Sequence, residues 1–420
     1  MLAAAVLLAG GCVVGLAAFR HQLSERKDRI TRVATQHRMT VRWGDSGSLM
    51  PLRSRLPSWI VPEFVDDYFQ VVSGIQVISL ETDLPARFFD DLRDCVSIRE
   101  LSWLDTRHSA QVAELVRRQR NLRVLELIPK GLRDEDLNAV ESLENLQFLQ
   151  IDGLESKQFD GRFLIAATRR TPHLKHLKLE HVNLSPAACL AIGRVFSLEN
   201  LNLTGCRLTA EAAKSLIGLP RLKRLILDDT LLDNAVGTTL GSMKLLESLS
   251  VKGTYLTETG LRELAGCTSL KSLVTGGKRG RSTLLASLKK CPRLTHLDVT
   301  WAGTWTRQEM AGFNGLPYVT FLYFSDIGDP EAEALTQCPH ISGLQIHSSR
   351  LTLQGIHSLM QLPELHYLKL TGREWSPELV DVLDESLTLE SVNVLGRGWE
   401  WNDFEGLREK LRDRGKKPGQ

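Results

Sequence analysis

One pattern of apolar positions recurs through the middle of the chain. Six-residue segments that begin at Leu198, Leu222 and Leu246 hold apolar residues at their first, fourth and sixth positions, with mostly polar residues between them. The three starting leucines lie 24 residues apart. A fixed period of this length indicates a solenoid, in which each unit buries its apolar face only by stacking on its neighbours.

Within each unit the pattern changes from that of a strand to that of a helix. Alternation around Leu225 predicts a short strand whose intervening residues face outward. The residues with helical spacing that follow it are Leu232, Val236, Leu240 and Met243. Asp233 can cap that helix. Small residues occupy the ninth position of three units, namely Cys206, Thr230 and Thr254. Their side chains can satisfy backbone groups of the turn.

The same period extends over most of the chain. The first positions of the units are Ile75, Ile98, Leu122, Leu146, Leu174, Leu198, Leu222, Leu246, Leu270, Leu294, Val319, Ile341, Leu365 and Leu389. One longer step follows Leu146, where residues 153–163 (GLESKQFDGRF) predict a bulging loop. We therefore expect an α/β solenoid of about 14 repeats over residues 75–396, with a parallel sheet on its concave side and helices on its convex side.

The segments that flank the repeats are expected to cover the ends of the solenoid, because each outermost unit exposes an apolar face. Residues 50–74 are dense in aromatic side chains, and we assign them to an N-terminal cap. Residues 21–49 form a charged segment in which we expect a helix and then a short strand over 39–43. Residues 397–420 are assigned to a C-terminal capping helix and a tail.

The chain begins with an apolar stretch. Residues 2–19 carry no charge, and about 18 apolar residues is near the lower limit for a membrane-spanning helix. We assign residues 1–20 to a single-pass N-terminal membrane anchor. A cleaved signal sequence, or a lipoprotein signal at Cys12, stays open as an alternative. The basic residues follow the stretch and none precedes it, which leaves the side of the membrane undecided.

The net charge narrows the classes of partner. The net charge of the 420 residues is only +2, so general affinity for nucleic acid is not expected.

Four of the seven cysteines lie three residues before the first position of a repeat, namely Cys95, Cys267, Cys291 and Cys338. This placement predicts small buried core residues. Cys267 and Cys291 fall on adjacent units, and a disulfide between them is left open.

Motifs of enzymatic chemistry are absent from the sequence. It contains no H-E-x-x-H, no G-x-S-x-G and no G-x-x-x-x-G-K-[ST] segment. The basic run 276–281 (GGKRGR) follows a repeat strand and is interpreted as a solvated turn. His296 and Asp298 are the one acid–base pair worth examining, and nothing near them indicates a nucleophile. We therefore predict neither an enzyme nor a cofactor or metal site.

The outward positions of the strands form two groups of candidate binding residues. The first group is rich in aromatic side chains: His296, Asp298, Trp301, Phe321, Tyr323, Asp326, His347, Tyr367 and Lys369. The second is polar: His176, Lys178, Glu180, Arg224, Asp228 and Asp229. Strands of successive units lie about 5 Å apart, so the first group is expected to form one contiguous patch. Aromatic side chains with a few charges are typical of protein–protein hot spots.

The repeat sequence also carries a resemblance to a known family. With the 24-residue L-x-x-L-x-L period and helices such as 257–264 (TETGLREL), the chain resembles the bacterial leucine-rich repeat proteins abundant in planctomycetes. Trp59 and Asp67-Tyr68-Phe69 match the aromatic stretch that often lies between a membrane helix and the repeats in those proteins. The resemblance implies a leucine-rich repeat horseshoe and a binding role, and it does not identify the partner.

These observations predict a non-catalytic, membrane-anchored leucine-rich repeat protein that binds a protein partner through its concave face. The alternative is an envelope-surface module that recognises a polysaccharide or a peptidoglycan-like ligand, because aromatic faces flanked by Asp and His suit sugar stacking. The partner and the oligomeric state stay open at this stage.

Overall fold

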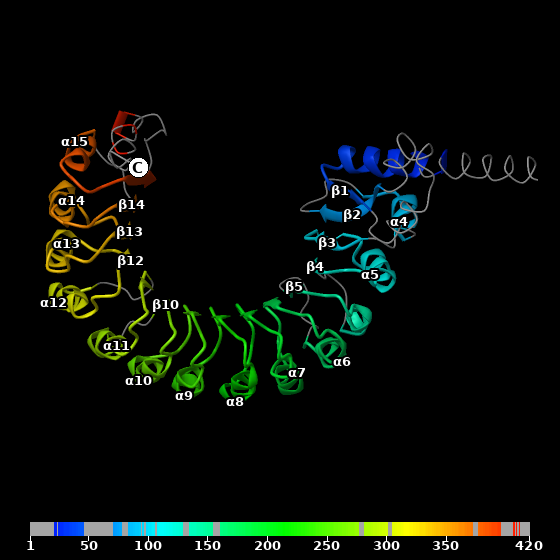
Figure 1. Ribbon diagram of the computed structural model, residues 1–420, viewed down its shortest axis with the longest axis horizontal. Coiled ribbons are helices and arrows are strands. Elements are labelled where there is room, and N and C mark those ends of the chain that lie inside the picture. Colours follow the sequence, from blue (N-terminus) through cyan, green and yellow to red (C-terminus); the bar gives the residue numbers. More distant parts are fainter. Residues whose placement is uncertain are drawn as a thin grey trace, which may run out of the picture. The chain divides into compact units, whose positions relative to one another are not determined.

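The computed structural model describes residues 21–22, 24–45, 70–77, 83–93, 95, 98–105, 107–128, 134–153, 160–276, 281–300, 305–372, 377–395, 406–407, 409 and 411. The chain forms two compact units, Met1–Leu198 and Glu199–Gln420. In each unit the helices lie on one side of a sheet (Figure 1). We call the other side, which faces away from the helices, the open face.

The described part of the first unit holds a six-stranded sheet. Its strands are β1 (Thr40–Asp45), β2 (Gln70–Val77), β3 (Glu100–Trp103), β4 (Val124–Leu127), β5 (Phe148–Asp152) and β6 (His176–Glu180). β1 pairs with β2 in antiparallel fashion, and each later strand runs parallel to the one before it. Besides a helix over residues 24–36, its helices are α4 (Ala86–Arg93), α5 (Ser109–Arg118), the 3-10 helix η1 (Asp134–Ser142), α6 (Phe163–Arg170) and α7 (Pro186–Ile192).

The described part of the second unit is built from nine parallel strands. They are β7 (Asn200–Asn202), β8 (Arg224–Ile226), β9 (Ser248–Val251), β10 (Ser272–Thr275), β11 (His296–Asp298), β12 (Phe321–Ser325), β13 (Gly343–His347), β14 (Tyr367–Thr371) and β15 (Ser391–Leu395). Each pairs in sequence order with the next. The α-helices are α8 (Ala210–Lys214), α9 (Gly237–Gly241), α10 (Glu258–Arg262), α11 (Arg281–Leu288), α12 (Arg307–Ala311), α13 (Asp329–Leu335), α14 (Leu353–Met360) and α15 (Leu379–Asp384). The 3-10 helices are η2 (Ser215–Gly218), η3 (Asn234–Val236), η4 (Glu263–Gly266) and η5 (Gly312–Gly315).

The apolar period of the sequence marks the core. The leucines that define it, such as Leu222, Leu225 and Leu227, are at most 2% exposed. The expected role of the ninth position is also confirmed. The hydroxyl of Thr230 donates to the carbonyl of Leu227 at 2.7 Å, a bond that satisfies a backbone group inside the turn. The α/β solenoid that the pattern predicts is therefore observed, with the polar positions of the strands on the open face.

The start of the sheet differs in register from the expected series. That series places Ile75 in line with Ile98, whereas β2 pairs Ile75 with Leu101. Ile75 therefore occupies the fourth position of its strand, and Gly74 comes to the third position, on the open face. Ile75 is buried in either register, because the first and the fourth positions of the repeat both face the core. The apolar pattern alone therefore does not distinguish the two registers.

The charged segment that precedes the repeats packs against the first unit. Residues 24–36 are helical and lead into β1, as expected. Ile30 of this helix is 1% exposed. The guanidinium of Arg29 donates two hydrogen bonds to the buried carboxylate of Asp91 on α4, at 3.0 and 2.8 Å. The helix thus covers apolar surface at the start of the sheet.

The cysteines of the repeats are core residues, as predicted, except that Cys95 is only half-buried. Cys267 and Cys291 are at most 2% exposed, and neither is in a disulfide. Their thiols donate instead to the carbonyls of Leu240 and Leu264, at 3.1 and 3.5 Å. Burial raises the pKa of Cys267 to about 12, so the thiol stays protonated.

The predicted membrane anchor requires a correction. In the part of the chain that the structure describes, no helix is both long enough and apolar enough to cross a membrane. A single-pass N-terminal anchor is therefore not supported by the structure. Residues 2–19, on which that assignment rested, lie outside the described residues, as do residues 50–69 of the predicted cap and 397–405 of the C-terminal segment.

Candidate functional site

Four aromatic rings meet on the open face of the second unit. His296 on β11 stacks on Phe321 of β12, with ring centroids 5.3 Å apart and planes inclined by 11°. Phe321 also contacts Tyr323 at 5.1 Å and Tyr367 of β14 at 5.3 Å, both at 37°. We call these four residues the aromatic cluster. Each such ring pair contributes about 0.5–1.5 kcal/mol beyond the burial of its surface, so the rings hold one another in place.

A glycine lets the ring of Phe321 on β12 reach Tyr367 on β14 across the strand between them. Phe321 and Tyr367 both align with Gly343, which lies on the strand between them. Strands two steps apart are separated by about 10 Å, too far for ring contact over an intervening side chain. A Cβ atom on Gly343 would lie 2.2 Å from Cε2 of Phe321 and 2.3 Å from its Cδ2. The ring of Phe321 therefore lies across the backbone of β13. The apolar pattern does not mark Gly343, because glycine adds no side chain to a surface.

The cluster is partly accessible to solvent. His296 is exposed, and Phe321, Tyr323 and Tyr367 are half-buried. The pKa of Tyr323 is raised, first by burial and then by the nearby carboxylate of Asp298 and by Tyr367. The phenol of Tyr323 therefore stays neutral at physiological pH and can both donate and accept a hydrogen bond.

Polar groups border the cluster. Gln345 aligns with Tyr323 on one side and with Lys369 on the other. Both Gln345 and Lys369 are half-buried on the open face. His347 is exposed at the end of β13, where its Nδ1 lies 2.9 Å from the hydroxyl of Thr371. These side chains supply hydrogen-bonding groups beside an aromatic centre.

The His296 and Asp298 side chains engage other partners. The carboxylate of Asp298 accepts hydrogen bonds from the backbone N–H and the hydroxyl of Thr300, at 2.9 and 2.7 Å. Nδ1 of His296 lies 2.9 Å from the hydroxyl of Thr295. Asp298 closes the turn at the end of its strand, and the two residues do not form an acid–base pair.

Asp326 lies in a turn rather than within a strand. Its φ is 53°, in the left-handed region, and Asp229 at the same place in its own repeat has φ 54°. Glycines adopt this conformation at the same place in other repeats, with φ 67° at Gly205 and 68° at Gly253. Asp tolerates left-handed backbone better than most residues, so the turn is a sufficient reason for its presence. Trp301, which the sequence placed in the same patch, lies outside the described residues.

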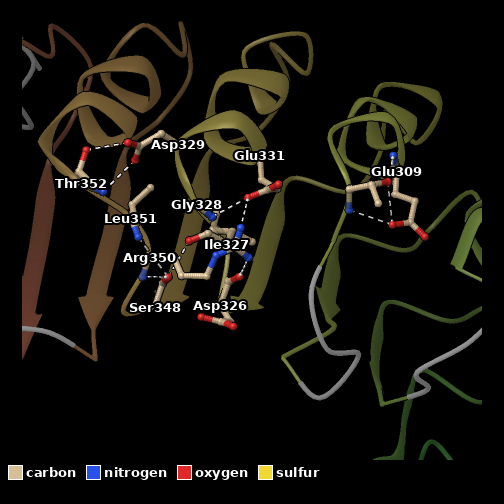
Figure 2. Close-up of polar contacts among 11 residues, drawn as sticks. Glu309, Asp326, Ile327, Gly328, Asp329, Glu331, Ser348, Arg350, Leu351 and Thr352 are labelled. Atoms are coloured by element: carbon tan, nitrogen blue, oxygen red, sulfur yellow. Dashed lines mark hydrogen bonds and ion pairs between the residues drawn. The ribbon is translucent and has the colours of Figure 1, made fainter.

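Hydrogen bonds between successive turns hold the ends of β12 and β13 in position (Figure 2). The carboxylate of Glu331 accepts from the backbone N–H of Gly328 at 2.7 Å. The guanidinium of Arg350 donates to the carbonyl of Asp326 at 3.0 Å and reaches Glu331 at 3.5 Å. Arg350 therefore links the turn that follows β13 to the turn that follows β12.

Two further contacts repeat this link. The buried hydroxyl of Ser348 donates to the carbonyl of Ile327 at 2.6 Å. The carboxylate of Asp329 accepts from the backbone N–H and the hydroxyl of Thr352, at 2.8 and 2.7 Å (Figure 2). These bonds join neighbouring repeats and fix the strands that carry the cluster.

Comparison with known proteins decides the family. The family model described as "Leucine-rich repeat region" matches residues 138–391, more than half of the chain. The chain belongs to the leucine-rich repeat family. The planctomycete type suggested by its sequence stays a prediction. No curated protein sequence matches this leucine-rich repeat protein.

Two solved structures are similar in fold. An internalin from Listeria monocytogenes has a TM-score of 0.48 and 16% sequence identity, over 85% of this chain and 96% of the internalin. TLR13, in its complex with ssRNA13, has a TM-score of 0.47 and 16% identity, over 76% of this chain and 49% of the TLR13 chain. Identity at this level concerns the fold alone.

The second predicted patch of this leucine-rich repeat protein divides between the two units. In the first unit, the ammonium of Lys178 forms an ion pair with Glu180 at 2.9 Å. The ring of His176 lies 6.0 Å from that of Phe148. His176, Lys178 and Glu180 are all half-buried on β6. They form a local polar surface of the first unit.

The remaining members of that patch lie in the second unit. The carboxylate of Asp228 accepts from the hydroxyl of Ser250 at 2.5 Å and from the backbone N–H of Lys252 at 2.9 Å, which ties two repeats together. Burial raises the pKa of Asp228, and these hydrogen bonds oppose the rise. Arg224 and Asp229 are exposed. Within the described residues, no group of three or more His, Cys, Asp or Glu side chains could hold a metal ion.

Proposed function

We propose that this leucine-rich repeat protein binds a protein partner through the aromatic cluster on the open face of its second unit, and that it is not an enzyme. The observation that carries the proposal is the packing of three partly accessible rings around a fourth, that of Phe321. Tyrosine and other aromatic residues are enriched at protein interfaces, and most of the binding energy resides in a few such residues near the centre.

The packing of the rings favours binding, because it holds them in place before a partner arrives. Because Phe321 is held by three neighbours, it has little freedom to lose when a partner binds, and this reduces the entropic cost of association. Gln345, Lys369 and His347 stand beside the cluster. They would supply the polar rim that protein interfaces have around an apolar centre.

Site-directed photo-crosslinking tests this function. A photoreactive phenylalanine analogue placed at Gln345, beside Tyr323 in the sheet register, should capture the partner in cells. The double variant Phe321→Ala/Tyr367→Ala should reduce the recovery about 30-fold, because losing a hot spot costs about 2 kcal/mol or more. Tyr255→Ala is the matched control, since Tyr255 is a 66% exposed tyrosine of the same unit outside the cluster.

Equal recovery from wild type and the double variant would refute the proposal. Both variants are first compared with wild type by circular dichroism, so that loss of folding is not mistaken for loss of binding. If no protein is captured and a purified polysaccharide binds in a cluster-dependent manner, the glycan alternative replaces the proposed protein partner.

A further inference from the structure

A hollow of about 210 Å³ lies on the open face of the first unit. Its lining includes Arg42, Gln76, Glu100, Ser102, Val124 and Glu126. We call it the Glu126 pocket. Arg42 and Glu100 both align with Gly74, which lies on the strand between them. The pocket is formed by strands β1 to β4 and does not involve the aromatic cluster.

The charges of the pocket leave one carboxylate without a close cation. Arg42 forms an ion pair with Glu100, which balances the charge of Glu100. The hydroxyl of Ser102 donates a hydrogen bond to Glu126. Among the residues that the structure describes, Glu126 has no ion-pair partner, and Lys178 acts on it only at longer range. The net charge of the pocket is therefore negative and is centred on Glu126.

The environment of Glu126 is unfavourable for a lone charge. Burial raises its pKa, Lys178 lowers it and Glu100 raises it further. A half-buried carboxylate of this kind gains from a cation that reaches it in a place of low water access. A bound cation would replace the water that the carboxylate has lost.

The lining and the volume of the pocket suit a long basic side chain. Val124 supplies an apolar wall beside Glu126. Alkyl stems of basic side chains pack along such surfaces while their charged ends reach a polar group. A volume of 210 Å³ equals that of about seven water molecules at about 30 Å³ each. It is comparable to an arginine side chain, which has seven non-hydrogen atoms.

We propose that the Glu126 pocket is a binding site for one arginine side chain, presented by a protein partner. The stem packs against Val124, and the guanidinium donates a pair of hydrogen bonds to the carboxylate of Glu126. The planar fork of arginine matches a carboxylate in this bidentate way, whereas the ammonium of lysine does not. The amide oxygen of Gln76 is available on the lining to accept a further bond.

A titration with a small probe tests the site in the full chain. N-acetyl-arginine methylamide is added to protein that carries labelled methyl groups, and the methyl spectra are followed by NMR. The matched probe is N-acetyl-citrulline methylamide, which has nearly the same shape and no charge. We expect saturable shifts of the Val124 methyl signals with the arginine probe, together with transfer of magnetisation from its methylene protons to Val124. Binding of the citrulline probe should be at least about tenfold weaker.

Two variants complete the test. Glu126→Gln keeps the size of the side chain and its bond to Ser102, and it should weaken the arginine probe at least about tenfold. Glu114→Gln removes a carboxylate of α5 that pairs with Arg117, away from the pocket, and should leave the affinity unchanged. Three results would overturn the proposal: no saturable binding of the arginine probe, equal affinity for both probes, or unchanged affinity in Glu126→Gln. The magnetisation transfer needs only the wild-type protein, so it decides the site even if Glu126→Gln fails to fold.

Discussion

Replacing Gly343 by alanine tests whether the aromatic cluster depends on a missing side chain. The new methyl group would lie 2.2 and 2.3 Å from two ring atoms of Phe321, whereas carbon atoms in contact are about 3.5–4.0 Å apart. Phe321 must therefore turn away from β13. The φ of Gly343 lies outside the left-handed region, so the backbone conformation itself accepts alanine. Any loss of stability in Gly343→Ala should thus come from displacement of the Phe321 ring and not from backbone strain.

The expected size follows from the contacts that the ring would lose. Turning Phe321 away breaks its stacking with His296 and its contact with Tyr367, which together contribute about 1–3 kcal/mol. Alanine also lowers the entropy of the unfolded chain, which stabilises the fold by about 0.4–1 kcal/mol. We expect Gly343→Ala to lower the free energy of unfolding by about 1–2 kcal/mol and to reduce binding of the partner as Phe321→Ala does.

Gly74 provides a matched control. It occupies the third position of β2, as Gly343 does in β13, and also lies between two strands whose side chains meet over it. A Cβ atom there would be 3.4 Å from Cβ of Glu100 and 3.5 Å from its Oε2, which are ordinary contacts. Gly74→Ala should therefore be neutral or stabilise the protein by about 0.5 kcal/mol.

Urea unfolding of a double-mutant cycle provides the assay. In the Phe321→Ala background there is no ring to displace, so Gly343→Ala should become neutral or stabilising, as Gly74→Ala is. The difference between the two backgrounds corresponds to a coupling energy of about 1–2.5 kcal/mol between positions 321 and 343, within the usual range for residues in contact. Near-ultraviolet circular dichroism should show the altered tyrosine environment only when Phe321 is present. If Gly343→Ala has the same effect with and without Phe321, the reasoning is wrong.

Three further outcomes follow from the buried polar groups. The pKa of Glu126 is raised in the folded state, so its contribution to stability is present at low pH and is lost as the pH rises through the folded-state pKa. Glu126→Gln should raise the urea midpoint at pH 7 and not at pH 3, and an equal gain at both would contradict this. Ser348 is 2% exposed, and its hydroxyl bonds to the turn of the preceding repeat and to a backbone N–H of its own turn, so Ser348→Ala should cost about 2 kcal/mol. In contrast, Ser349→Ala at the exposed neighbour should cost less than about 0.5 kcal/mol, as measured by the same unfolding curves. The thiol of Cys267, with a pKa of about 12, should react with iodoacetamide at pH 8 only as the protein unfolds, and mass spectrometry of its peptide would reveal any faster reaction.

Much of the candidate site was predictable because the apolar period determines which face each strand residue occupies. His296, Phe321, Tyr323 and Tyr367 fall on the open face, as their positions in the repeat require. The period does not say what each side chain does there. Asp298 holds its expected strand position and yet serves the turn that follows it through Thr300, because a short acidic side chain bonds readily to the backbone two residues later.

The Glu126 pocket had no signal in the sequence. Arg42 and Glu100 are 58 residues apart in the chain and meet because β2 pairs with both of their strands. The register of β2 was itself ambiguous, since isoleucine satisfies the apolar pattern at either the first or the fourth position. A contact between distant segments depends on this register, and local periodicity does not contain it.

The sequence by itself determined the repeating strand and helix, the buried leucines such as Leu225, and the aromatic character of the open face. These properties are local, because burial follows from the period of apolar residues within a few turns of chain. Only the tertiary structure decided that Phe321 crosses Gly343 to reach Tyr367 and that Glu126 lies in a pocket with Glu100. Those arrangements depend on the volumes of side chains brought together from neighbouring repeats, which become defined only when the units stack.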